Sequence, residues 1–277
     1  MRMRTGVIAA VLAALATAAS AQAPAPMREF DQPTTISLGR QLQAQSHMIT
    51  VAAYTARTGG VDLAAERLDR WVAVSDTRMR LLRRSVGGQV DAPYDVVFAP
   101  GTEPQLVKAA DPKLGGEMLT RVRAGDTAIK AAGPLCSGEK PIVAVSKDPQ
   151  RDGWLVWLLR PSGAGIFAIG GHVRVSVSAD GAKATQVDSL SSRCDTWEMP
   201  DARARMAAEP VVAIDLDLSD APLETHVLIA LQTNAPLVTG VDNDTPKWIV
   251  SRDTIRPWRG DPSAALRALA RTLPARR

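Results

Sequence analysis

The sequence offers three imidazoles for acid–base or metal chemistry, those of His47, His172 and His226. His172 and His226 each open a segment with the pattern of a β-strand, so the two rings could be neighbours in one sheet. Together with a carboxylate they would form the acid–base or metal site of a small hydrolase. The candidate carboxylates are Asp215, Asp217 and Glu224.

The spacing of these histidines argues against a metal, because zinc sites usually present two ligands a few residues apart and this chain has no such pair. The interpretation that we favour is structural: each histidine is hydrogen-bonded to a backbone carbonyl or caps the end of a strand. The run from Asp215 to Asp220 lacks the central Gly and distal Glu of an EF-hand. Ser162 lacks the two flanking glycines of a nucleophile elbow. We therefore predict no metal and no cofactor, and the sequence identifies no catalytic residue.

A predicted antiparallel sheet in the middle of the chain would position His172. Residues 154–159 form a continuous apolar run, and residues 172–178 alternate polar and apolar side chains at every step. An Asp-Gly pair at 180–181 then predicts a hairpin whose second strand covers residues 184–190. His172 would therefore begin a strand that has partners in this sheet.

The alternating strand would carry one polar face. Because successive strand side chains point to opposite faces, His172, Arg174 and Ser176 lie on one side and the intervening valines on the other. Such a strand is half-buried. The candidate site is therefore a polar face formed by His172, Arg174, Ser176 and, from a later strand, His226.

The remaining patterns complete an α+β fold. Helical periodicity covers residues 34–59, 62–71, 112–131 and a last segment from Asp261 onward. Further strand patterns lie at residues 78–83, 94–98, 105–108, 142–145, 210–218, 226–231, 236–239 and 248–250. We predict a single α+β domain over residues 34–277, with an antiparallel β-sheet of six or more strands, N-terminal and C-terminal helices, and one disulfide. Residues 22–33 would be a disordered lead-in.

The first 21 residues have the pattern of a signal peptide. Arg2 and Arg4 precede an apolar core at residues 6–16, and residues 19–21 supply the small side chains of a cleavage site. The core is too short to span a bilayer, and no later segment approaches the length of a membrane helix. We therefore predict cleavage near Ala21 and a periplasmic or secreted protein without a membrane span.

The charge of the chain does not indicate a nucleic-acid partner. Removal of Arg2 and Arg4 lowers the formal net charge from +4 to +2. Two arginine clusters remain, at residues 78–84 and 267–277, and no aromatic residues interleave with them as in a single-strand binding groove. We interpret both clusters as solvated faces.

The two cysteines, Cys136 and Cys194, are expected to form a disulfide. An even number of cysteines in an exported chain favours one bridge. It would close a loop of about sixty residues, to which the chain-entropy model assigns roughly 4 kcal/mol of stabilisation. A reactive thiol or metal ligand is the alternative, but neither residue stands in a Cys-x-x-Cys pair or beside a histidine.

Several segments resemble a group of uncharacterised exported proteins of Gram-negative bacteria. The segments are Gly153–Leu159, Gly170–Gly181 followed by Cys194, and Glu224–Leu231 followed by Pro236-Leu237 and Trp248. The resemblance covers residues 130–256. It implies no activity, because that group has no assigned catalytic residues to carry over.

These observations predict a periplasmic binding or accessory protein without catalysis, whose partner is a small ligand or an envelope protein. The alternative is a small periplasmic hydrolase, with or without a metal, that uses His172 and His226. A third possibility, an envelope structural protein held in a complex, would require a sizeable exposed apolar patch.

Overall fold

The computed structural model describes residues 26–136, 138, 140–163, 165–198, 212–214, 216, 218–242 and 245–259. This part of the chain has the predicted α+β fold. Its helices are α1 (Gln32–Thr58), α2 (Gly116–Ala132) and α3 (Glu224–Thr233). It also contains three four-stranded sheets, which we name N-terminal, central and C-terminal by their position in the chain, and one two-stranded sheet.

The N-terminal sheet contains β1 (Leu68–Ser75), β2 (Arg78–Arg84), β3 (Val90–Val97) and β4 (Gln105–Lys108). The central sheet has the order β5 (Ile142–Lys147), β6 (Trp154–Leu159), β8 (Val173–Val177) and β9 (Ala184–Ser189). The two-stranded sheet is β7 (Ile166–Ala168) with β10 (Thr196–Glu198). The C-terminal sheet contains β11 (Val212–Ile214), β12 (Leu237–Asp242), β13 (Thr245–Val250) and β14 (Ile255–Pro257).

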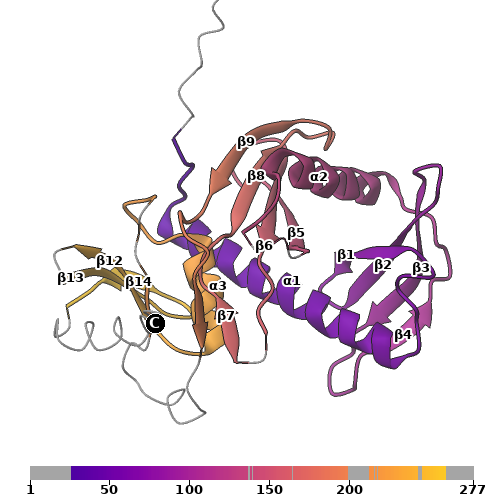
Figure 1. Ribbon diagram of the computed structural model, residues 1–277, viewed down its shortest axis with the longest axis horizontal. Coiled ribbons are helices and arrows are strands. Elements are labelled where there is room, and N and C mark those ends of the chain that lie inside the picture. Colours follow the sequence, from indigo (N-terminus) through magenta and orange to yellow (C-terminus); the bar gives the residue numbers. More distant parts are fainter. Residues whose placement is uncertain are drawn as a thin grey trace, which may run out of the picture.

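The long helix α1 connects these sheets. In Figure 1 it runs from the C-terminal sheet and α3 at one end to the N-terminal sheet at the other, with the central sheet and α2 above it. Neighbouring strands are antiparallel, except that β11 runs parallel to β12. The strands that we expected in one sheet of six or more are thus divided among smaller sheets, because α3 packs between the central and C-terminal sheets.

The central sheet is covered on both faces, which explains the apolar run in β6. Alternate residues from Trp154 to Leu158 pack with α2, whereas Leu155, Trp157 and Leu159 pack with α1 and α3. Every side chain of β6 is therefore buried. A continuous apolar strand is what a sheet with two covered faces requires.

Residues 226–231, predicted as a strand, lie in α3 instead. A short run of consecutive apolar residues fits either a buried strand or a buried helix, because it has no alternation of apolar and polar residues that would distinguish them. Val227 and Ile229 pack with the C-terminal sheet, whereas Leu228 packs with the central sheet. Gly39 of α1 permits the two helices to cross closely, since a Cβ there would lie 2.5 Å from the Val227 Cβ.

Residues 62–71, predicted as a short helix, form a turn followed by β1. The Asp62 carboxylate accepts two backbone N–H groups at 3.0 Å, as an N-cap does, but the chain leaves the turn at once. Arg67 has a φ of 56°, a left-handed conformation that interrupts a helix. Leu68 and Trp71, which suggested the helix, reach the core from the strand and pack against α1.

Cys136 and Cys194 form the predicted disulfide, with their Cα atoms 5.8 Å apart. The Gly170-Gly171 turn packs against this bridge. A Cβ on Gly171 would lie 2.4 Å from the Cys136 Sγ, and Gly171 has a φ of 75° that favours glycine. Contact with the disulfide therefore explains Gly171, whereas a Cβ on Gly170 would lie 2.4 Å from the Arg193 carbonyl oxygen.

Some predicted features lie outside the described residues, namely the signal peptide at 1–21, the start of the lead-in and the last helix from Asp261. Contrary to the predicted disorder, residues 26–31 make defined contacts, and Arg28 is buried. We call residues 26–31 the strap. Among the described helices, none combines the length and apolarity needed to cross a membrane.

Candidate functional site

The predicted polar face of β8 is closed. The exposed fractions of His172, Arg174 and Ser176 are 4%, 0% and 3%. Contacts from α3 and from the strap cover this side of the sheet. The expectation of a half-buried strand was therefore wrong, because α3 and the strap cover the polar side while α2 covers the valine side.

Arg174 is the centre of a buried ionic cluster. Its Nη2 lies 2.8 Å from Asp188 Oδ2 on β9, and its Nη1 lies 2.8 Å from Glu224 Oε1 on α3. Trp157 on β6 donates its Nε1–H to the same Glu224 oxygen at 2.7 Å. Arg174 Nη2 also donates to the Arg28 carbonyl oxygen of the strap. The cluster thus connects the central sheet, α3 and the strap.

The geometry of this cluster indicates a structural role. Two carboxylates face one guanidinium, and none of the three side chains is more than 2% exposed. Removal of one member of a buried ion pair typically costs about 3–5 kcal/mol, because it leaves the other charge unpaired. Glu224 Oε2 and Ser176 Oγ are also buried without a hydrogen-bond partner. The cluster therefore stabilises the arrangement of its elements and presents no atom to a substrate from solvent.

His172 is bound at both ring nitrogens. Its Nδ1 accepts the Arg160 N–H at 3.1 Å, so Nε2 carries the proton and donates to the Ala168 carbonyl oxygen at 3.1 Å. Burial lowers the pKa of His172 from 6.5 to about 4, and the ring is neutral at pH 7. This arrangement leaves no lone pair for a metal ion.

His226 lies on a helix and not, as predicted, on a strand of the same sheet as His172. His226 is in the first turn of α3, where its Nδ1 accepts the Leu223 N–H at 2.8 Å. His47 is exposed on α1. Asp215 and Asp217 lie outside the described residues. Within the part of the chain that the structure describes, no three His, Cys, Asp or Glu residues could together hold a metal ion.

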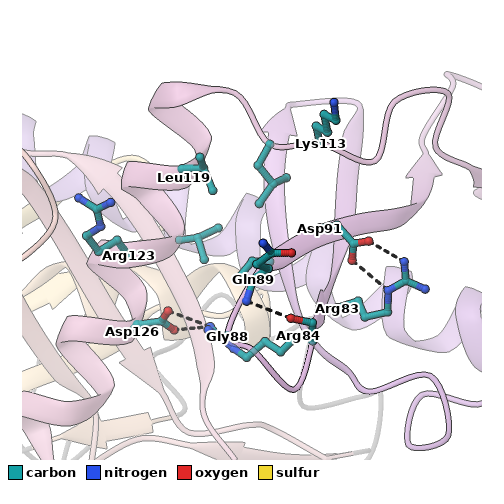
Figure 2. Close-up of a pocket in the computed structure, with 13 residues that line it drawn as sticks. Arg83, Arg84, Gly88, Gln89, Asp91, Lys113, Leu119, Arg123 and Asp126 are labelled. Atoms are coloured by element: carbon teal, nitrogen blue, oxygen red, sulfur yellow. Dashed lines mark hydrogen bonds and ion pairs between the residues drawn. The ribbon is translucent and has the colours of Figure 1, made fainter.

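A groove lies between the β2–β3 hairpin and α2 (Figure 2). Its volume is about 830 Å³. The hairpin contributes Arg83, Arg84, Ser85, Gly88, Gln89, Val90 and Asp91, and the segment that enters and forms α2 contributes Lys113, Leu114, Leu119, Val122, Arg123 and Asp126. The groove is thus built from two segments that are separate in the sequence.

Both carboxylates of the groove are held by arginines. Arg83 pairs with Asp91, with Nε 2.9 Å from Oδ1, and Arg84 Nη2 lies 2.6 and 2.8 Å from the two Asp126 oxygens. The hydrogen bond and the charge of Asp91 raise the pKa of Arg83. These two pairs neutralise the carboxylates and attach the hairpin to α2 through Asp126.

Lys113 and Arg123 carry the positive charge that is left. Both side chains are exposed, and neither forms an ion pair with a carboxylate among the described residues. Arg123 Nη1 donates to the Asp180 carbonyl oxygen at 3.2 Å. Figure 2 places Arg123 and Lys113 on opposite sides of the groove, with Leu119 between them. The groove therefore has a net positive charge at its rim.

The surface between these two cations is apolar. Leu114 and Val122 are buried and belong to the cluster that links α2 to the N-terminal sheet. Leu119 remains 41% exposed. A molecule in the groove would meet hydrocarbon along its length and positive charge near its ends.

Sequence reasoning did not find this groove. It treated Arg83 and Arg84 as part of a solvated arginine cluster, whereas each arginine of β2 faces an aspartate. The register of the predicted hairpin could have shown this, because Arg83 lies directly opposite Asp91. The contribution of α2 could not be seen, since it depends on how the helix packs on the hairpin.

In comparisons with family models, curated proteins and solved structures, no match to this chain was found. The function is therefore argued from the geometry of the groove.

Proposed function

We propose that this chain is an exported, non-catalytic binding protein, and that its ligand is a small amphiphilic anion held in the groove between the β2–β3 hairpin and α2. The signal-peptide pattern of residues 1–21 and the disulfide support a periplasmic location, because disulfides persist in oxidising compartments. The resemblance to exported Gram-negative proteins agrees with this location.

The observation that carries the proposal is two exposed cations, neither of which forms an ion pair with a carboxylate of the described chain, beside an apolar floor. Ligand pockets are typically concave and apolar, with a few polar groups that orient the ligand. Here Leu114, Leu119 and Val122 would contact the apolar body of the ligand. Lys113 and Arg123 would attract its anionic group. A neutral ligand would gain nothing from these two charges.

A fluorescence titration with the anionic probe 8-anilinonaphthalene-1-sulfonate tests the proposal. Lys113→Glu combined with Arg123→Glu should weaken binding of the probe by about tenfold or more, because the rim becomes negative. Lys130→Glu is the matched control, since Lys130 is exposed on α2 and does not line the groove. Equal affinities for the double variant and the control would refute an anion site here.

The apolar half of the groove needs a separate measurement. Leu119→Ser removes an apolar side chain that is 41% exposed, so the fold should tolerate it. The variant should bind both the anionic probe and the neutral probe N-phenyl-1-naphthylamine more weakly. If the charge reversal weakened binding of the probes but Leu119→Ser did not, the groove would bind anions without an apolar part, and the proposal of an amphiphilic ligand would be wrong.

A further inference from the structure

The strap is held by a buried arginine. Arg28 is 7% exposed, and its Nη2 lies 2.7 Å from Asp148 Oδ1 and 2.9 Å from Gln150 Oε1. Its Nη1 donates to the other Asp148 oxygen. The turn after β5 therefore forms a pocket with a carboxylate and an amide oxygen, which matches the donors of a guanidinium.

An aromatic ring two residues later makes the second contact. The Phe30 ring contacts two guanidinium groups, with its centroid 4.8 Å from the Arg28 Cζ and 4.9 Å from the Arg174 Cζ. Met27 and Phe30 also pack against the core cluster that α1 and the central sheet share. Arg174 donates to the carbonyl oxygen of Arg28. Glu29, between the two anchors, is exposed.

The strap depends on these side chains for its position. Residues 26–30 of the strap have no regular secondary structure, and none of the backbone–backbone hydrogen bonds found outside helices and strands in the described chain involves them. The last strap residue, Asp31, accepts the Thr35 N–H at 2.8 Å where α1 begins. Gln186 Nε2 donates to the Pro26 carbonyl oxygen at 3.0 Å, from the exposed edge of the sheet. Segments with few backbone hydrogen bonds belong to the part of a structure that opens most easily.

Two polar atoms near Arg174 are buried without a hydrogen-bond partner. Arg174 touches the strap directly, and Glu224 Oε2 in its cluster is buried without a partner. Ser176 Oγ, on the same face of β8, also lacks a partner.

We infer that the strap occupies a peptide-binding site, and that an extended polypeptide with an arginine followed two residues later by an aromatic residue binds the same site in trans. Asp148 and Gln150 would bind the arginine of that partner, and Arg174 would bind its backbone carbonyl and its aromatic ring. This site is separate from the groove at α2 and does not depend on the function proposed for it.

The test uses the full mature chain, residues 22–277, with Arg28→Ala and Phe30→Ala to weaken the strap. A fluorescein-labelled peptide with the sequence of residues 23–31 is titrated by fluorescence anisotropy. The variant should bind it at least about tenfold more tightly than the unaltered chain, because the competing strap of the same chain has a high effective concentration. The matched control Glu29→Ala changes an exposed strap residue and should bind as weakly as the unaltered chain.

Two further measurements establish specificity. In the first, a peptide with alanine in place of its arginine should bind the weakened chain about tenfold less tightly than the original peptide does. In the second, adding Asp148→Asn to the weakened chain should lower its affinity for the original peptide by about tenfold. Equal binding of the two peptides, or equal affinities of the weakened and unaltered chains, would overturn the inference. A dimer of the unaltered chain that Arg28→Ala abolishes would support binding in trans and would identify the strap of a second copy as the partner.

Hydrogen exchange on the unaltered chain covers the case in which the double variant does not fold. The strap amides should exchange at least about a hundredfold faster than those of β6, because the strap opens locally. Strap amides protected as strongly as those of β6 would show that the segment does not leave its site.

Discussion

At the scale of single residues, the buried ring of His172 should make the stability of this molecule depend on pH. Its pKa is about 4 in the folded chain, against 6.5 for an unperturbed histidine. Above pH 6.5 neither the folded nor the unfolded chain binds a proton at this ring. As the pH falls from 6.5 to 4, the histidine of the unfolded chain becomes protonated, whereas the buried ring of the folded chain stays mostly neutral. The stability that comes from burying the neutral ring is therefore lost over this window.

The free energy of unfolding should fall by roughly 3 kcal/mol between pH 7 and pH 4 because of His172 alone. Urea unfolding at several pH values measures this slope. His172→Asn, whose amide can still accept the Arg160 N–H, should show a shallower slope than the unaltered chain. His47→Asn is the control, since His47 is exposed. Parallel slopes for all three chains would contradict a buried neutral His172.

At the scale of secondary-structure elements, the crossing of α1 and α3 is the contact that places Glu224 on the sheet. A Cβ at Gly39 would lie 2.5 Å from the Val227 Cβ and 2.9 Å from the Glu224 carbonyl oxygen. Gly39→Ala should therefore lower the free energy of unfolding by about 1–3 kcal/mol, the usual cost of overpacking. This cost opposes the gain of roughly 1 kcal/mol that alanine has over glycine inside a helix.

Gly116→Ala is the matched control for this substitution. Gly116 begins α2, and a Cβ there would have no atom within 4 Å. This variant should be as stable as the unaltered chain or slightly more stable. Both variants are compared by thermal and urea unfolding. If Gly39→Ala stabilised the chain as well, the close approach of the two helices would be wrong.

At the scale of the whole molecule, the disulfide connects the segment before β5 to the segment before β10 across a sequence separation of 58. Replacement of both Cys136 and Cys194 by serine should lower the free energy of unfolding by about 4 kcal/mol, because the unfolded chain regains the entropy of an open loop. Urea unfolding with and without reductant measures the effect. Reductant should destabilise the unaltered chain and leave the serine variant unchanged. A serine variant as stable as the oxidised chain would contradict this role of the bridge.

The sequence by itself determined the local elements: α1, α2, the hairpin around Asp180-Gly181, most strands and the Cys136–Cys194 bridge. Periodicity and turn residues depend on a few consecutive residues, and the cysteine count requires no information about which segments are in contact. Only the tertiary structure decided that residues 226–231 form a helix and that Arg174 is buried against Glu224. It also decided that the hairpin and α2 enclose a groove. The physical reason is that a sequence pattern shows which face of an element is apolar or polar, whereas the element that covers that face is chosen by contacts between distant segments.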